Sequence, residues 1–110
     1  MRRILRSGFG AAVVLWAAAV SVLSGPASAE EMAAADAAAR RIIAAHCALC
    51  HPPLPDGTGW VQMTVVPRDR AGWASELRRM GTDYDAPLSM DERMTLLDYL
   101  SRAFGPGADG

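Results

Sequence analysis

The stretch Cys47-Ala48-Leu49-Cys50-His51 decides how the rest of this 110-residue chain is interpreted. It places two thiols three residues apart, with an imidazole directly after the second. Two thiols at this spacing can add to the two vinyl groups of a haem, and the histidine that follows can then ligate the iron. The pattern therefore predicts one covalent haem c, attached through Cys47 and Cys50, with His51 as the proximal ligand.

Three other uses of the two cysteines are less favoured by the surrounding sequence: a redox-active dithiol, a structural disulfide and a zinc site. A thioredoxin-like dithiol normally starts a helix within an α/β unit, whereas the flanking residues here are helix formers without runs of β-branched residues. Structural zinc takes four ligands from two separated pairs. All cysteines and histidines of this chain are crowded between His46 and His51, which cannot surround one ion tetrahedrally. We expect His46 itself to lie near a helix end, where its charge suits the helix dipole.

The amino-terminal sequence is typical of a secretory signal. Three arginines within the first six residues precede an apolar run at residues 9–23, and residues 25–29 have the small-residue pattern of a cleavage site. We expect a signal peptide at residues 1–29 and a single domain at residues 30–110. The apolar run is shorter than the roughly 20 residues that a membrane span needs, so no stable span is expected after cleavage. Export agrees with haem attachment, which bacterial-type maturation carries out outside the cytoplasm, and a periplasmic location is predicted.

The charge of the expected mature chain excludes one class of partner. Three of the 11 arginines lie in the signal, which leaves 8 against 12 acids and a formal charge of −4. Nucleic acid is therefore not an expected partner. Any positive docking surface must come from arginine, because the chain has no lysine, and Arg78-Arg79 is the best local pair.

The size of the mature domain predicts a structural role for the cofactor. Removing 29 of the 110 residues leaves 81, and a domain of that length buries only a marginal apolar core. A buried porphyrin would add apolar surface that the chain lacks. We therefore expect the haem to form part of the core and the haem-free chain to fold poorly.

A first helix is expected over residues 30–47, which are rich in alanine, with acids early and Arg40 and Arg41 late. The prolines and glycines of residues 52–59 then predict a stiff loop. A carbonyl of this loop is expected to orient His51 through the ring nitrogen that is not on iron.

The apolar residues 60–66 are ambiguous between strand and packed loop, and we interpret them as loop. Trp60 within them is expected to pack around the porphyrin, to be a plain core aromatic, or to lie partly exposed at a partner surface.

Two further helices are expected, and no convincing strand, which makes the fold class all-α. Trp73, Leu77 and Met80 follow helical spacing in residues 71–80, and Gly81 is a plausible left-handed stop.

Ser89 and Glu92 form a capping box for a last helix over residues 90–104, with Gly105-Pro106 just past its end. Its apolar face should pack on the first helix and the haem edge; this face contains Leu96, Leu97, Leu100 and Phe104.

This arrangement resembles the class I c-type cytochromes, in which a helix leads into the attachment motif and a terminal helix carries an aromatic residue. Tyr99, in Leu97-Asp98-Tyr99-Leu100, carries that likeness. Residues 41–105 are similar to small monohaem subunits of periplasmic dehydrogenases of the sulfite-oxidising type. The residues that carry this similarity are Trp73, Leu77, Met80-Gly81, Ser89 to Glu92, and Asp98-Tyr99-Leu100. The proline-rich stretch at residues 52–55 and the short connection to Met80 depart from the family pattern.

The resemblance implies a fold, contacts and partners. The N- and C-terminal helices would pack together around the covalent haem, with Trp73 and Tyr99 as cofactor-binding residues. A periplasmic dehydrogenase would donate electrons, and a downstream cytochrome or oxidase would accept them.

The sixth iron ligand expected from the family pattern is Met80, which precedes Ser89 by nine residues. A thioether opposite histidine favours the ferrous state. Met63 is the second candidate, and the remaining alternative is that Met80 is a core residue. Met90 and Met94 are expected to be packing residues, and Met32 lies too close to the helix of the motif itself.

We therefore expect a single-electron carrier or enzyme subunit that is not itself catalytic. The alternative is a haem with an open distal position, acting as a gas sensor or peroxidase. A peroxidase needs a distal acid–base group, and no histidine besides His46 is present.

Overall fold

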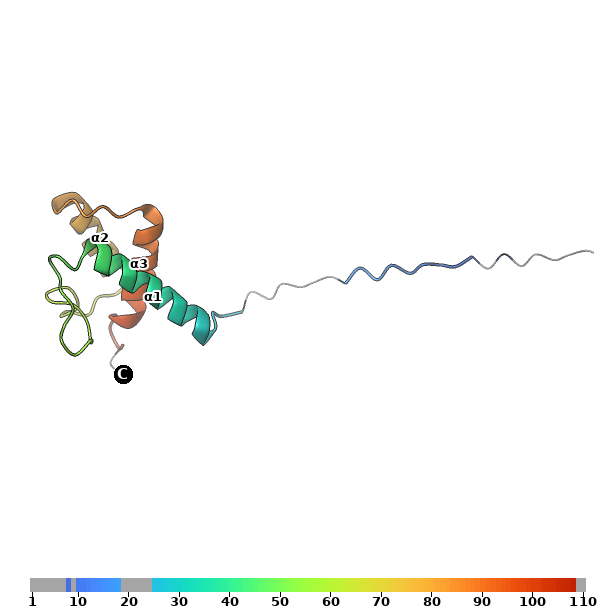
Figure 1. Cartoon of the computed structure of the whole chain (residues 1–110), viewed down its shortest axis with the longest axis horizontal. Helices are drawn as coiled ribbons and strands as arrows, with labels where there is room; N and C mark the ends of the chain where they lie inside the picture. The colour runs from blue at the N-terminus through green and yellow to red at the C-terminus, as the bar shows by residue number, and fades with distance from the viewer. Residues whose placement is uncertain (1–7, 9, 19–24, 109–110) are drawn as a thin grey trace, which may run out of the picture.

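The computed structural model of the chain describes residues 8, 10–18 and 25–108. These residues form three α-helices, α1 (Ala29–His46), α2 (Arg70–Asp83) and α3 (Met90–Ala103), joined by irregular segments (Figure 1). Over the described ranges there is no strand, only one isolated antiparallel bridge between Pro53 and Trp60. The all-α class is confirmed, and the loop interpretation of residues 60–66 agrees with the turns found there.

Helix α1 begins and ends within a residue of the expected limits. Its N-cap is Ser28, whose hydroxyl accepts a hydrogen bond from the Glu31 N–H at 3.2 Å. The helix ends at His46, where the Ile43 carbonyl accepts from the N–H groups of both Cys47 (2.8 Å) and Ala48 (2.9 Å) and the chain turns into the cysteine motif. Its buried residues are Ala39 and Ile43.

Helix α2 corrects the expected stop at Gly81. The helix runs through Gly81 to Asp83, and the left-handed residue that follows it is Asp85, with φ 53°. The Met80 carbonyl accepts hydrogen bonds from the N–H groups of Tyr84 (3.3 Å) and Ala86 (3.1 Å), which closes the helix end. Gly81 instead allows a close approach to α3, since a Cβ there would lie 3.2 Å from Nη2 of Arg93.

Helix α3 starts where the sequence predicts. Ser89 is its N-cap and accepts from the Glu92 N–H at 3.1 Å. The helix ends at Ala103, with Phe104 as the C-cap. Gly105 follows because a side chain there would collide with the Ser101 carbonyl.

Helix α3 is the centre of the fold. Both α1 and α2 pack on it, whereas the described Cα atoms of α1 and α2 do not approach within 8 Å of each other. The largest fully buried side chains are Ile43, Leu96 and Leu100. The separation of α1 from α2 leaves space beside α3 for the candidate site.

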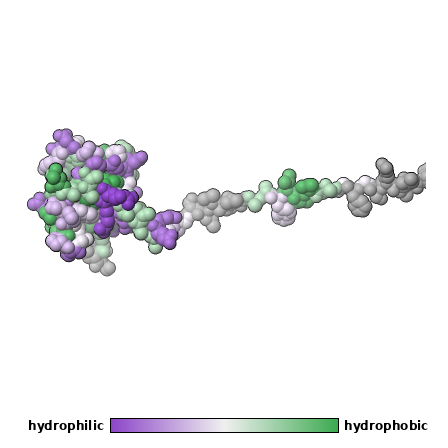
Figure 2. All heavy atoms as spheres, viewed as in Figure 1, coloured by the Kyte–Doolittle hydropathy of each residue, from purple (hydrophilic) through white to green (hydrophobic). Residues whose placement is uncertain are grey.

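The expected signal peptide is only partly covered, since residues 1–7, 9 and 19–24 lie outside the described residues. Residues 10–18 form no helix, and their apolar side chains are exposed, as Figure 2 shows for the segment apart from the helices. Among the described helices, none is long and apolar enough to cross a membrane. The predicted cleavage after Ala29 would remove the Ser28 cap and leave Glu30 and Glu31 to stabilise the first turn of α1.

Candidate cofactor site

A cavity of about 530 Å³ lies beside α3, between the end of α1 and α2. Leu96 and Leu100 of α3 line it, and Trp73 and Leu77 contribute from α2. Trp73 is held in place because its indole N–H donates to the Phe104 carbonyl at 3.2 Å. The volume falls within the roughly 300–1,000 Å³ typical of small-molecule and cofactor sites.

The cysteine motif bends into this cavity. The N–H groups of Cys50 and His51 both donate to the Cys47 carbonyl, at 3.2 and 2.8 Å, so the chain closes a tight turn directly after α1. Cys47, Cys50 and His51 all line the cavity as a result. The turn brings both thiols and the imidazole to one wall.

Both cysteines are free thiols, and they differ in their surroundings. Cys50 is exposed, whereas Cys47 is half-buried. Burial raises the pKa of the Cys47 thiol, and the neighbouring Cys50 raises it further. Cys47 is therefore a neutral thiol at neutral pH.

The imidazole of His51 is oriented by a backbone carbonyl. Its Nδ1 lies 2.9 Å from the Val61 carbonyl oxygen. A carbonyl only accepts, so Nδ1 carries the proton and Nε2 keeps the lone pair that a metal needs. The expected device is present, but its carbonyl comes from Val61, two residues beyond the predicted 52–59 loop. The loop still contributes, because the Pro52 carbonyl accepts from the Val61 N–H at 2.9 Å.

Two methionines line the cavity, Met80 at the end of α2 and Met63 in the loop. The two hydrogen bonds to the Met80 carbonyl fix the backbone from which its side chain extends. Of the six predicted site residues, the structure brings five to the cavity: Cys47, Cys50, His51, Trp73 and Met80.

The sixth, Tyr99, does not line the cavity. It is only 2% exposed and lies in an aromatic cluster with Trp60 and Phe104, with ring centroids 5.9–6.3 Å apart in edge-to-face geometry. The guanidinium of Arg40 covers the rings of Trp60 and Tyr99 at 5.7 and 5.9 Å. Burial raises the pKa of the Tyr99 hydroxyl. Trp60 is buried in this cluster as well and does not line the cavity, which agrees with the core position among the three expected for it.

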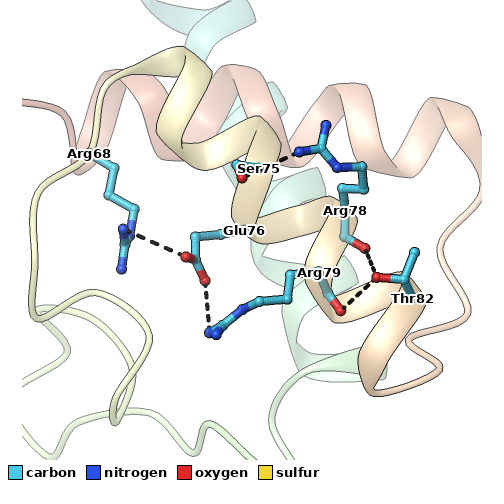
Figure 3. Close-up of polar contacts among 6 residues, drawn as sticks. All are labelled: Arg68, Ser75, Glu76, Arg78, Arg79 and Thr82. Atoms are coloured by element: carbon cyan, nitrogen blue, oxygen red, sulfur yellow. Dashed lines mark hydrogen bonds and ion pairs between the residues drawn. The ribbon is translucent and has the colours of Figure 1, made fainter.

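Sequence reasoning missed a charged group at the cavity. Glu76 lies between two arginines, with Oε1 3.6 Å from Arg68 and Oε2 3.2 Å from Arg79 (Figure 3), and all three line the cavity. Arg78 is different, since its guanidinium donates to the Ser75 hydroxyl at 3.4 Å. The expected Arg78-Arg79 pair is thus divided between two environments. The three-residue spacing of Glu76 and Arg79 could have indicated an ion pair on one helix face, but nothing in the sequence linked Arg68 to them.

The cavity wall carries sulfur and imidazole donors together with two carboxylates, those of Glu76 and Asp85. Three or more histidine, cysteine or acidic side chains do not converge on a metal-sized site anywhere in the described chain. The cavity instead combines two thiols, one oriented imidazole and two thioethers, which suits haem c better than a bare ion. No protein-family model, curated protein or solved structure matches this chain.

Proposed function

We propose that this chain is a periplasmic monohaem c-type cytochrome that transfers single electrons, as the electron-accepting subunit or partner of a periplasmic dehydrogenase. One observation carries the proposal: a single cavity collects Cys47, Cys50, His51 and Met80. Within it, the His51 Nδ1 is bonded to the Val61 carbonyl and Nε2 is left for iron.

The residues of the cavity fit this cofactor. Cys47 and Cys50 would form the two thioether links, His51 and Met80 would ligate the iron, and Trp73, Leu77, Leu96 and Leu100 offer the apolar wall that a porphyrin needs. Arg68 and Arg79 share the carboxylate of Glu76, so one net positive charge of these three groups remains for the carboxylates that haem carries. The cofactor supplies reversible one-electron chemistry when bound.

The chain's own residues tune that chemistry and need not act as catalysts. The Val61 carbonyl increases the basicity of His51. A Met80 thioether favours the reduced state, and the apolar wall limits water and raises the potential. The packing of α1 on α3 supports a small class I cytochrome fold, in which the first and last helices meet beside the haem.

The proposed partners are a periplasmic dehydrogenase as donor, of the sulfite-oxidising type by resemblance, and a cytochrome or oxidase as acceptor. The signal-like amino terminus supports the location. Arg78, exposed on α2 with its guanidinium on the Ser75 hydroxyl, offers a positive group for docking. Co-purification of the chain with a dehydrogenase encoded beside it tests this partnership, and a solitary gene for a freely soluble carrier would count against it.

Carbon monoxide binding to the reduced protein separates an electron carrier from an open-site sensor or peroxidase. We expect little rapid binding to the native protein, because Met80 would fill the sixth position. Met80→Ala should bind carbon monoxide rapidly, while Met63→Ala, a change of the same size at the same cavity, should not. Rapid binding by the native protein would favour the open site. His46 lines the cavity but directly precedes Cys47 at the attachment motif, so it is poorly placed to reach the opposite face of the haem as a distal acid–base group.

A further inference from the structure

Gln62 has a backbone conformation that glutamine rarely adopts. Its φ is 58°, in the left-handed region, and the only other non-glycine residue with positive φ in the described chain is Asp85. Both residues line the cavity. Unfavourable backbone conformations persist only where the surroundings over-determine them, and they cluster at functional sites. The left-handed conformation of Gln62 is therefore expected to serve a function at the cavity.

The side chain of Gln62 does not supply that function. It is exposed, and no hydrogen bond of its amide is found across the described residues. The backbone does. The peptide unit that joins Val61 to Gln62 contains the carbonyl that accepts from His51, and its orientation depends on ψ of Val61 and φ of Gln62.

The chain is held on both sides of this peptide. Before it, the Val61 N–H donates to the Pro52 carbonyl at 2.9 Å. After it, the N–H groups of Met63 and Thr64 donate to the Trp60 carbonyl, at 3.2 and 3.3 Å. The Thr64 hydroxyl also accepts from the Trp60 N–H at 3.0 Å. With both flanks held, moving Gln62 to negative φ would turn the Val61 carbonyl away from His51.

We propose that Gln62 is a positioning residue for His51, whose left-handed backbone aims the Val61 carbonyl at Nδ1. The role of His51 as an iron ligand rests on the proposed function, but the link between Gln62 and the ring tautomer does not. The turn keeps the proton on Nδ1 and the lone pair of Nε2 directed to the cofactor. This assigns a purpose to the left-handed conformation of Gln62, which the Gln62 side chain itself does not explain.

Two substitutions of Gln62 test the link in opposite directions. Gln62→Val should disfavour the left-handed turn, because β-branched residues tolerate positive φ poorly, whereas Gln62→Gly adopts it freely. Asp85→Val is the matched control, since it places the same strain at the other left-handed residue of the cavity, on the Met80 side. Each variant is prepared as the matured full-length product and studied in the reduced state.

The first readout is the ring nitrogen resonances of His51 and the exchange rate of its Nδ1 proton. Gln62→Val should accelerate that exchange about fivefold, the equivalent of one ordinary hydrogen bond. Gln62→Gly and Asp85→Val should leave it unchanged. The second readout is the midpoint potential. It should rise in Gln62→Val, because a less basic imidazole stabilises ferric iron less, and stay native in Gln62→Gly.

Native His51 signals in a folded Gln62→Val protein would overturn the inference, and so would an equal change in Asp85→Val. If Gln62→Val does not fold, loss of the native His51 signal in Gln62→Gly would overturn it. Failure of the proposed function shows itself separately, as a native protein without haem absorbance. In that case the His51 resonances still report whether Gln62 controls the carbonyl.

Discussion

His46 and Glu92 connect the end of α1 to the start of α3, with Nε2 of the imidazole 3.2 Å from Oε2 of the carboxylate. The capping-box pattern predicts that Glu92 reaches back to the N-cap Ser89. The structure uses only half of that motif, because the Ser89 hydroxyl accepts from the Glu92 N–H while the Glu92 carboxylate lies on His46. Glu92, which the capping box predicts to stabilise α3, thus also connects α3 to the end of α1, next to the cysteine motif.

The His46–Glu92 contact should contribute measurably to stability. Both side chains are about one-third exposed, so we expect Glu92→Ala to lower the free energy of unfolding by about 0.5–1 kcal/mol more than Asp91→Ala. Asp91 is the matched control, because it places the same charge in the same first turn of α3. Urea unfolding at pH 6 measures the difference, and equal losses in the two variants would show that the pair adds nothing.

The buried hydroxyl of Tyr99 should make the fold sensitive to alkali. Burial raises the pKa of Tyr99, so above about pH 10 the unfolded chain loses this proton while the folded chain keeps it. Stability from this group is therefore complete below pH 10 and falls as the pH rises through the folded pKa.

Tyr99→Phe should flatten this alkaline decline of the unfolding free energy. Tyr84→Phe, which removes the same hydroxyl from an exposed side chain, should retain it. An equally steep decline in Tyr99→Phe and the native protein would mean that another group is responsible.

Met80→Ala should abolish the weak long-wavelength sulfur-to-iron absorbance of the oxidised protein and lower its midpoint potential. Met63→Ala, at the same cavity, should retain both. The opposite result would transfer the sixth position to Met63.

The haem-free chain should fold poorly. Without a cofactor, the cavity of about 530 Å³ leaves apolar walls of α2 and α3 open to water. We expect Cys47→Ala with Cys50→Ala to lose much of the helical circular dichroism signal at 25 °C. The single Leu49→Ala variant, which alters a side chain 98% exposed between the same two cysteines, should keep it. Native-like helicity in the double variant would contradict a structural role for haem.

Local signals in the sequence predicted the helices well, because caps and periodic apolar residues act within a few positions. Ser89 and the glycine after Phe104 bracket α3 as expected. The helix end predicted at Gly81 was wrong, because a glycine can either end a helix or allow another segment to pack closely against it. Only the approach of Arg93 from α3 distinguishes these two roles. The actual left-handed stop, Asp85, carries no comparable signal.

The candidate site was predictable where chemistry is carried by adjacent residues, as in Cys47, Cys50 and His51. Contacts between distant segments were not. Nothing in residues 60–66 marks Val61 as the partner of His51, since any residue offers a carbonyl. Tyr99 was expected near the cofactor from the family resemblance, and Trp60 as an aromatic residue that could cover the porphyrin, but they pack on each other at 6.3 Å beneath Arg40. Which aromatic residue meets the cavity depends on how α1 and α3 cross, and the sequence pattern does not specify that.

The central claim is that Cys47 and Cys50 hold one haem covalently. Its most direct test is the intact mass and absorbance of the chain after secretion from a bacterium with haem-attachment machinery. We expect a red protein whose mass exceeds that of the processed polypeptide by one haem, retained after denaturation, and whose Cys47→Ala, Cys50→Ala variant carries none. A colourless native protein at the mass of the polypeptide alone would contradict the account.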